Sequence, residues 1–160
     1  MGKQQPIEIF MPPNMLKAKV GGSAGGLDMS AIKRAEKAIE TLRVEFTDWI
    51  NADVERLAAA REAFAKAPDA ERQDDLFRAG HDLKGQALTF GFPMAARVAA
   101  SLCKLLDGNG RAPLPLIDAH VDAIRVIVRN NVKDESDRVA NILASELEGR
   151  VAESLKANAA

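Results

Sequence analysis

The chain has 160 residues, of which 47% are hydrophobic and 28% charged, and its formal net charge is −1. This composition is typical of a globular protein with one core, and it excludes a disordered chain. The balanced charge gives no electrostatic basis for binding nucleic acid or a membrane surface, so we expect neither as a partner. Cys103 is the single cysteine, which excludes an internal disulfide and fits a reducing compartment.

No stretch of the sequence approaches the ~20 apolar residues of a membrane span, and the N-terminus has no apolar run of signal-peptide length. We therefore expect a cytoplasmic protein. Alanine, leucine, arginine and glutamate are abundant, tyrosine is absent, and no alternating strand pattern of useful length is found. The composition and the periodicity together predict an all-α fold.

Residues 1–27 differ from the remainder of the chain. They contain three prolines and the glycine-rich run 21–26, which do not support a helix. We expect this segment to be a flexible tail, with docking on the domain or on a partner as the alternative. Residues 28–160 are expected to form a helical domain.

Helical periodicity begins near Asp28 or Ser30, either of which is a suitable N-cap, and ends before Pro68. The apolar positions along this segment are Ile32, Ala35, Ile39, Leu42, Phe46, Ile50, Val54, Leu57 and Phe64. The pattern is compatible with one long helix over residues 30–66 or with two helices hinged near residues 51–53.

Three further amphipathic segments follow a helix predicted over about residues 70–90. Pro93 is placed to begin the next helix, residues 107–110 form a loop, and Pro113 and Pro115 open another helix. Short connections between such helices favour antiparallel neighbours. The sequence therefore predicts an up-down antiparallel four-helix bundle with an additional C-terminal helix.

The segment His81-Asp82-Leu83-Lys84-Gly85 is the constellation that most clearly suggests chemistry. Residues three and four apart share one stripe of a helix, so His81, Lys84 and Gly85 are neighbours on its surface. The residues on the predicted buried sector of this helix are Leu76, Gly80, Leu83, Ala87 and Phe90. His81 lies roughly 110–120° from the centre of that sector, so we expect it to face solvent.

These residue types suit the transfer of a phosphoryl group. Neutral imidazole is a good nucleophile near neutral pH, and an ammonium group one turn away at Lys84 stabilises the negative charge that a phosphoryl group adds. Gly85 costs the helix roughly 1 kcal/mol relative to alanine, a cost explained if a side chain there would block a partner's approach to His81. Leu88 and Phe92 are expected to add exposed apolar surface for docking a protein.

The pattern His81-x-x-Lys84-Gly85, followed by Gly91, resembles the histidine phosphotransfer (Hpt) domain of multistep two-component phosphorelays. The lead-in from Leu76 to Gly80 is also similar, although Gly80 stands where alanine is commoner. The resemblance covers about residues 40–132 and leaves the N-terminal tail and the last helix outside it.

The resemblance implies a four-helix bundle that carries a phosphoryl group on one exposed histidine. His81 would accept the group through Nε2 from a receiver-domain aspartate and pass it to another receiver aspartate. Lys84 would stabilise charge and Gly85 would give the receiver access, while Arg78 flanks the site and is grouped with Leu88 and Phe92 as a partner-binding residue. The partners implied are receiver domains of response regulators or a hybrid histidine kinase.

The aspartate and the Mg²⁺ of this chemistry would come from the receiver, so no cofactor and no metal site are expected in this chain. No phosphate-binding glycine pattern is present, and ATP-dependent kinase activity is not expected. The alternative function is a non-catalytic helical adaptor that binds a signalling partner through Leu88 and Phe92. A dimeric phosphotransferase is a further alternative, so the oligomeric state is left open.

His120 and Cys103 are the other candidate reactive residues. His120 flanks a predicted apolar face and is expected to be a structural, partly buried histidine. A metal site that combined His120 with His81 would need ligands from different helices in no recognisable spacing. Cys103 lies at the edge of an apolar stripe and is expected to be a small packing residue.

Overall fold

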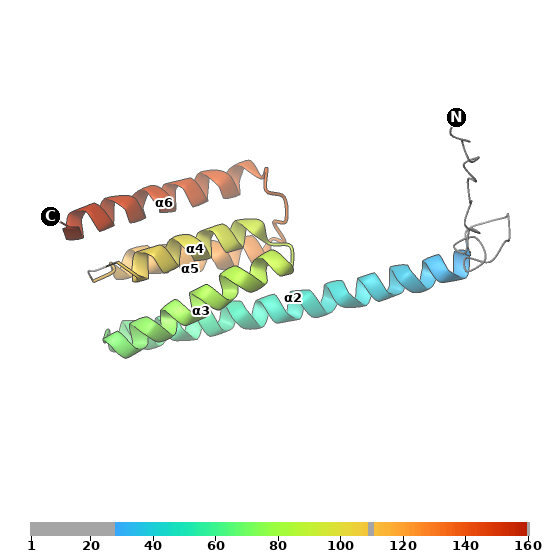
Figure 1. The fold of residues 1–160 in the computed structure, drawn as a ribbon, viewed down its shortest axis with the longest axis horizontal. Coiled ribbons are helices and arrows are strands. Elements are labelled where there is room, and N and C mark those ends of the chain that lie inside the picture. The colour runs from blue at the N-terminus through green and yellow to red at the C-terminus, as the bar shows by residue number, and fades with distance from the viewer. Residues whose placement is uncertain (1–27, 109–110, 160) are drawn as a thin grey trace, which may run out of the picture. The chain divides into compact units, whose positions relative to one another are not determined.

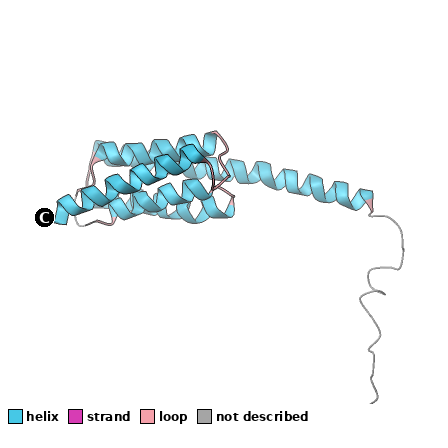
Figure 2. Ribbon diagram, turned by 90° about the horizontal axis from the view of Figure 1, so that it is seen from above, coloured by secondary structure: helices cyan, strands magenta, loops and turns pink. Residues whose placement is uncertain are grey.

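The computed structural model describes residues 28–108 and 111–159, and within these ranges it contains helices and no strand (Figure 1; Figure 2). The helices are α2 (Met29–Lys66), α3 (Ala70–Thr89), α4 (Pro93–Leu106), α5 (Leu114–Arg129) and α6 (Arg138–Ala159). The predicted all-α fold is confirmed. The tail predicted for residues 1–27 lies outside the described residues. None of the described helices is both long and apolar enough to cross a membrane.

Helix α2 is one continuous helix of 38 residues, so the two-helix alternative is wrong. The chain divides into two compact units, Met1–Ile39 and Glu40–Ala160, with the border inside α2. In the second unit the apolar stripe of α2 is buried from Ile50 onward, where Val54, Leu57 and Phe64 enter the core. This part of α2 is a bundle helix, and an ion pair between Arg61 and Asp118 joins it to α5 at 2.5 Å.

Helix α4 lies at the centre of the second unit. It packs against α3, α5 and α6, and most of its residues are buried, including Val98, Leu102 and Leu105. Its alanines Ala95 and Ala99 are fully buried, and small residues allow neighbouring helices to approach closely. The tightly packed core along α4 therefore holds the other helices in register.

Consecutive helices run antiparallel and are joined by short connections (Figure 1). The second half of α2 shares one core with α3, α4 and α5 in an up-down bundle, and α6 packs against α4 and α5 on the outside. The predicted bundle with an additional C-terminal helix is confirmed. As predicted, Pro93 is the first residue of α4, and Pro113 directly precedes α5.

His120 lies in the core between α5 and α4 and is fully buried. Its Nδ1 is 2.7 Å from the carbonyl oxygen of Leu116, and its Nε2 is 3.0 Å from the hydroxyl oxygen of Ser101. A carbonyl oxygen only accepts, so Nδ1 donates to Leu116 and Nε2 accepts from the Ser101 hydroxyl. Both ring nitrogens are therefore occupied, and the predicted structural role is confirmed.

Acidification is predicted to destabilise the fold through His120. Burial lowers the pKa of His120 in the folded chain, whereas the unfolded chain takes the ordinary value of about 6.5. Below that pH the unfolded chain binds a proton that the folded chain does not. The free energy of unfolding then falls by up to about 1.4 kcal/mol per pH unit until the folded-state pKa is reached.

Urea unfolding curves, recorded by circular dichroism at pH values from about 7.5 to about 5, measure how the free energy of unfolding depends on pH. The variant His120→Asn removes the titrating ring, so its stability should fall less steeply with pH than that of the wild type. Identical slopes in the two proteins would assign the acid sensitivity to other groups.

Candidate functional site

Helix α3 is buried along one face and exposed along the other. Its buried residues are Leu76, Gly80, Leu83 and Ala87. His81 and Gly85 are exposed, Lys84 is half-buried, and Leu88 is 61% exposed. The predicted outward orientation of His81 is confirmed, and this side chain is accessible to a partner.

The ends of α3 are fixed by its sequence. Asp69 is the N-cap, and its carboxylate accepts a hydrogen bond from the backbone N–H of Arg72 at 2.8 Å. At the other end Gly91 has a φ of +80°, which is favourable only for glycine. Its N–H donates to Leu88, and the N–H of Phe92 donates to Ala87, so the helix ends in a Schellman motif.

Phe92 is 1% exposed, so the prediction that it contributes to an exposed docking surface is wrong. The cause is its place in the Schellman motif, because the residue after the left-handed glycine packs back against the last turn of the helix. The ammonium group of Lys133 lies 4.9 Å from the centre of the Phe92 ring and covers it further. Leu88 therefore remains as an exposed apolar residue beside the site, and its role in binding stays a prediction.

Phe77 belongs to the site and was missed from the sequence. Its ring stacks on the His81 ring, with 6.1 Å between centroids and 24° between planes. Phe77 is half-buried against the core, so the bundle holds its ring beside the imidazole. The i to i+4 spacing of the two rings was the available signal, because such residues are neighbours on a helix surface.

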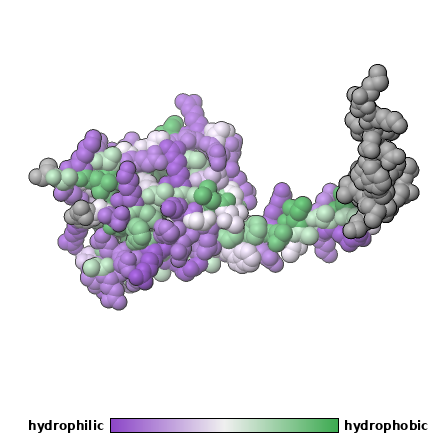
Figure 3. Space-filling model, in the orientation of Figure 1, coloured by the Kyte–Doolittle hydropathy of each residue, from purple (hydrophilic) through white to green (hydrophobic). Residues whose placement is uncertain are grey.

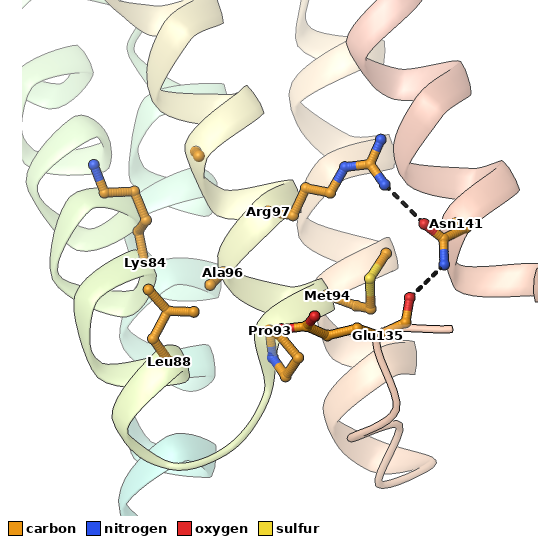
Figure 4. A pocket seen from close by; sticks show the side chains of 9 residues that line it. Lys84, Leu88, Pro93, Met94, Ala96, Arg97, Glu135 and Asn141 are labelled. Carbon is orange, nitrogen blue, oxygen red and sulfur yellow. Dashed lines mark hydrogen bonds between the residues drawn. The ribbon is translucent and has the colours of Figure 1, made fainter. Parts of the chain in front are cut away.

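Lys84 and Leu88 also line a groove of about 460 Å³ between α3, the start of α4 and the start of α6 (Figure 4). The groove is completed by Pro93, Met94, Ala96, Arg97, Ala100, Glu135 and Asn141. Arg97 donates to Asn141 at 2.9 Å and to both carboxylate oxygens of Glu148 at 2.7 Å. These bonds tie α4 to α6 and fix one wall of the groove.

The Arg78 side chain is on the exposed side of α3 and forms an ion pair with Asp74 one turn earlier, at 2.5 Å. Exposed pairs of this kind contribute little to stability, so Arg78 is free to exchange this partner for another carboxylate. Its predicted role in partner binding is not tested by this contact.

The other candidate reactive groups are not part of the site. The Cys103 side chain is buried, and burial raises the pKa of its thiol, which keeps the thiol protonated. His120 has no free ring nitrogen. Among residues 28–108 and 111–159, no three His, Cys, Asp or Glu side chains are grouped closely enough to hold a metal ion.

Two glycines of α3 differ in what surrounds them. A β-carbon at Gly85 would meet no atom within 4 Å, so nothing in the packing of the described residues requires glycine there. A β-carbon at Gly80 would lie 3.4 Å from the sulfur of Cys103 and 3.7 Å from Leu102, which are ordinary contact distances. Neither glycine is required by backbone strain, since both lie inside a regular helix.

Comparison with known proteins gives two matches. The model of the Hpt domain matches residues 41–153, which is well over half of the chain and includes most of α6. This match extends beyond the 40–132 region recognised from the sequence. The chain is also 43% identical over 51 residues to the chemotaxis protein CheA of Klebsiella aerogenes, covering 32% of this chain and 8% of that protein. No solved structure matches the chain.

Replacing either glycine of α3 with alanine is predicted to stabilise the fold. Alanine is favoured over glycine inside a helix by about 0.8–1 kcal/mol, and both positions accept a β-carbon. Urea unfolding of Gly80→Ala and Gly85→Ala should therefore show free energies of unfolding higher than that of the wild type by roughly 0.5–1 kcal/mol. A loss of stability in Gly80→Ala would mean that Cys103 and Leu102 do not accommodate the added methyl group.

Proposed function

This chain belongs to the Hpt domain family, whose function is histidine phosphotransfer in two-component signalling; on that premise, we propose that His81 carries the phosphoryl group. The observation that carries the proposal is the exposed His81 on the outer face of α3, inside the region that matches the family. The described residues contain one other histidine, His120, and both of its ring nitrogens are already hydrogen-bonded in the core.

In the proposed reaction, His81 takes a phosphoryl group from a receiver-domain aspartate and later passes it to the aspartate of another receiver. A lone pair on Nε2 of His81 attacks phosphorus, the bond from phosphorus to the aspartate oxygen breaks, and its electrons return to that carboxylate. Stacking on Phe77 limits the orientations of the ring and so favours in-line attack. The receiver supplies the aspartate and the Mg²⁺, so this chain contributes the nucleophile and its surroundings.

Lys84 is proposed to stabilise negative charge on the transferring group. It follows His81 by three residues on the same helix, and its half-buried position restricts the stem of the side chain. Interaction with an ammonium group at about 4 Å is worth at most ~4 kcal/mol at an effective dielectric constant near 20, and less where water remains. The contribution is largest once a docked receiver excludes water from the site.

The surface around His81 is proposed to receive the partner domain. Gly85 leaves the backbone of α3 uncovered beside the imidazole, and Leu88 offers an exposed apolar contact. Arg78 lies on the same outer side and provides a positive charge for the acidic surroundings of a phosphorylated aspartate. Receiver domains of response regulators or of a hybrid histidine kinase are the proposed partners, and the cytoplasm is the proposed location.

The adaptor alternative rested on a surface formed by Leu88 and Phe92. Burial of Phe92 removes half of that surface, and an adaptor has no need of a bare helix backbone at Gly85. Phosphotransfer therefore accounts for more of the exposed face of α3 than adaptor binding does.

The variant His81→Gln tests the proposal. Incubation with a receiver phosphorylated by its own kinase should transfer acid-labile, alkali-stable label to the wild type and none to the variant. Since His81 is exposed, the variant should keep its helical circular dichroism and its unfolding midpoint. The matched control His120→Asn alters the other histidine and should still accept label. Labelling of a folded His81→Gln protein would contradict the proposal.

Replacement of Lys84 with alanine should slow transfer by roughly 10- to 100-fold, which corresponds to about 1.4–2.7 kcal/mol of lost charge stabilisation. The control is Lys104→Ala, because Lys104 is an exposed lysine of α4 whose charge acts on Glu148. Rapid-quench kinetics with one receiver compare the two variants. Equal rates in Lys84→Ala and the wild type would remove Lys84 from the mechanism.

The variants Gly80→Ala and Gly85→Ala distinguish an effect on the receiver's access to His81 from an effect on the stability of the fold. Both are expected to be more stable than the wild type, yet only Gly85→Ala places a methyl group on the surface that a receiver must approach. Transfer should be slower in Gly85→Ala, slower again in Gly85→Leu, and unchanged in Gly80→Ala. Wild-type rates in all three variants would mean that Gly85 does not provide access.

A further inference from the structure

A groove with a mainly apolar lining lies next to the candidate site, between α3, the start of α4 and the start of α6 (Figure 4). The surface of the bundle drawn in Figure 3 is mostly hydrophilic, with smaller hydrophobic areas among the polar side chains. The groove has a volume of about 460 Å³, within the range of roughly 300–1,000 Å³ of pockets that enclose organic groups. Such a groove is a candidate for binding an apolar group of another molecule. Its apolar lining residues, all in the second unit, are Leu88, Pro93, Met94, Ala96 and Ala100.

The polar side chains on the α6 side of the groove are bonded within the chain. Asn141 accepts a hydrogen bond from Arg97 at 2.9 Å. Its amide N–H groups donate to the carbonyl oxygens of Glu135 at 2.6 Å and of Asp137 at 2.9 Å. Arg97 also donates to both carboxylate oxygens of Glu148. Because these groups already have partners, the wall is preorganised and suits an apolar occupant better than a polar one.

The groove adjoins the residues proposed for phosphotransfer. His81, Lys84 and Leu88 follow one another at intervals of three and four residues, so they lie on one stripe of α3. At 1.5 Å per residue, Leu88 is about 10 Å along the helix from His81. A small interface covers roughly 600–800 Å² on each partner, and a circle of that area has a radius of about 14–16 Å. A receiver centred on His81 therefore covers Leu88 and the mouth of the groove.

Charge favours a receiver as the partner that fills the groove. Lys84 lines the groove one turn from His81, and its ammonium group has no ion pair or hydrogen bond among residues 28–108 and 111–159. A receiver brings the negative charge of its phosphorylated aspartate to this position, so the ammonium group gains a partner as the groove is covered. A wholly apolar partner would remove water from the ammonium group without providing an opposite charge, which is costly.

We propose that the groove accepts an apolar side chain of the receiver domain that docks on His81. The inference rests on the proposed function, because it names a second contact of the same partner. The first contact is the aspartate, which every receiver offers. The second contact depends on the side chain that a receiver presents about 10 Å away, so the groove discriminates between receivers. The start of α6 forms one wall of the groove and thereby contributes to the choice of partner.

Filling the groove tests the proposal. Ala100 lines the groove and is exposed, so the variant Ala100→Phe should occupy the groove without disturbing the core. The matched control Ala119→Phe makes the same substitution at an exposed alanine of α5 that does not line the groove. The variant Ala100→Ser keeps the side chain small and should leave the groove open. Circular dichroism and urea unfolding verify that the three proteins are folded.

Binding is measured by titration calorimetry, with every variant made in a His81→Gln background so that no transfer occurs. The probes are the receiver domains of the source organism, each saturated with beryllofluoride and Mg²⁺ to imitate the phosphorylated aspartate. For the receiver that binds best, Ala100→Phe should raise the Kd by at least about 10-fold, whereas Ala119→Phe and Ala100→Ser should leave it unchanged. Equal affinities of Ala100→Phe and Ala119→Phe, or no binding by any receiver, would overturn the proposal.

Alanine substitution of the exposed apolar residues of that receiver identifies the occupant. One such substitution should weaken binding to the Ala100→Ser protein by about 10-fold and have little effect on binding to the Ala100→Phe protein, whose groove is already filled. The absence of any such coupled residue would also overturn the proposal.

Label transfer to the protein that retains His81 is measured separately. Transfer to His81 together with binding that does not depend on the groove would overturn this inference and leave the proposed function intact. Groove-dependent binding without transfer to His81 would support the groove as a docking site and contradict the proposed function.

Discussion

Helix α3 is buried against its neighbours along one face only, and the remaining features of the site depend on that one-sided burial. Leu76, Leu83 and Ala87 are fully buried, so α3 cannot rotate about its axis without exposing them to water. Complete burial of a leucine side chain is worth about 1.5–3 kcal/mol, and α3 buries two of them. This rotational constraint holds His81 toward solvent on a rigid element, where a site is positioned more accurately than on a loop.

The proposed phosphotransfer would need few residues of this chain. In the proposed reaction the receiver would supply the aspartate and the Mg²⁺, and this chain would supply a nucleophile, a nearby positive charge and unobstructed backbone. The Phe77 ring stacks beside the His81 ring, Lys84 is one turn away, and Gly85 leaves open space. The stability lost at Gly85 is small beside the core formed around α4, so the fold tolerates glycine at the position where we propose that a receiver approaches.

Periodicity predicted most of the fold, because each bundle helix buries a regular stripe and is bounded by proline, glycine or a capping residue. The outward orientation of His81 followed from the same reasoning. The predicted exposure of Phe92 was wrong because a helical wheel does not apply beyond Gly91. There the chain reverses direction, and the next side chain packs into the core. Burial along α2 was not predictable either: the apolar spacing before and after Ile50 is similar, and only the tertiary structure shows where covering helices are present.

Mapping the phosphorylated residue decides whether His81 carries the phosphoryl group. After transfer from a phosphorylated receiver, the chain can be digested at neutral or alkaline pH and sequenced by mass spectrometry with electron-based fragmentation, which preserves the bond between phosphorus and nitrogen. We expect phosphate on His81 and none on His120, whose ring nitrogens are both hydrogen-bonded in the core. Phosphate found on His120 or on a carboxylate of this chain, with His81 unmodified, would contradict it.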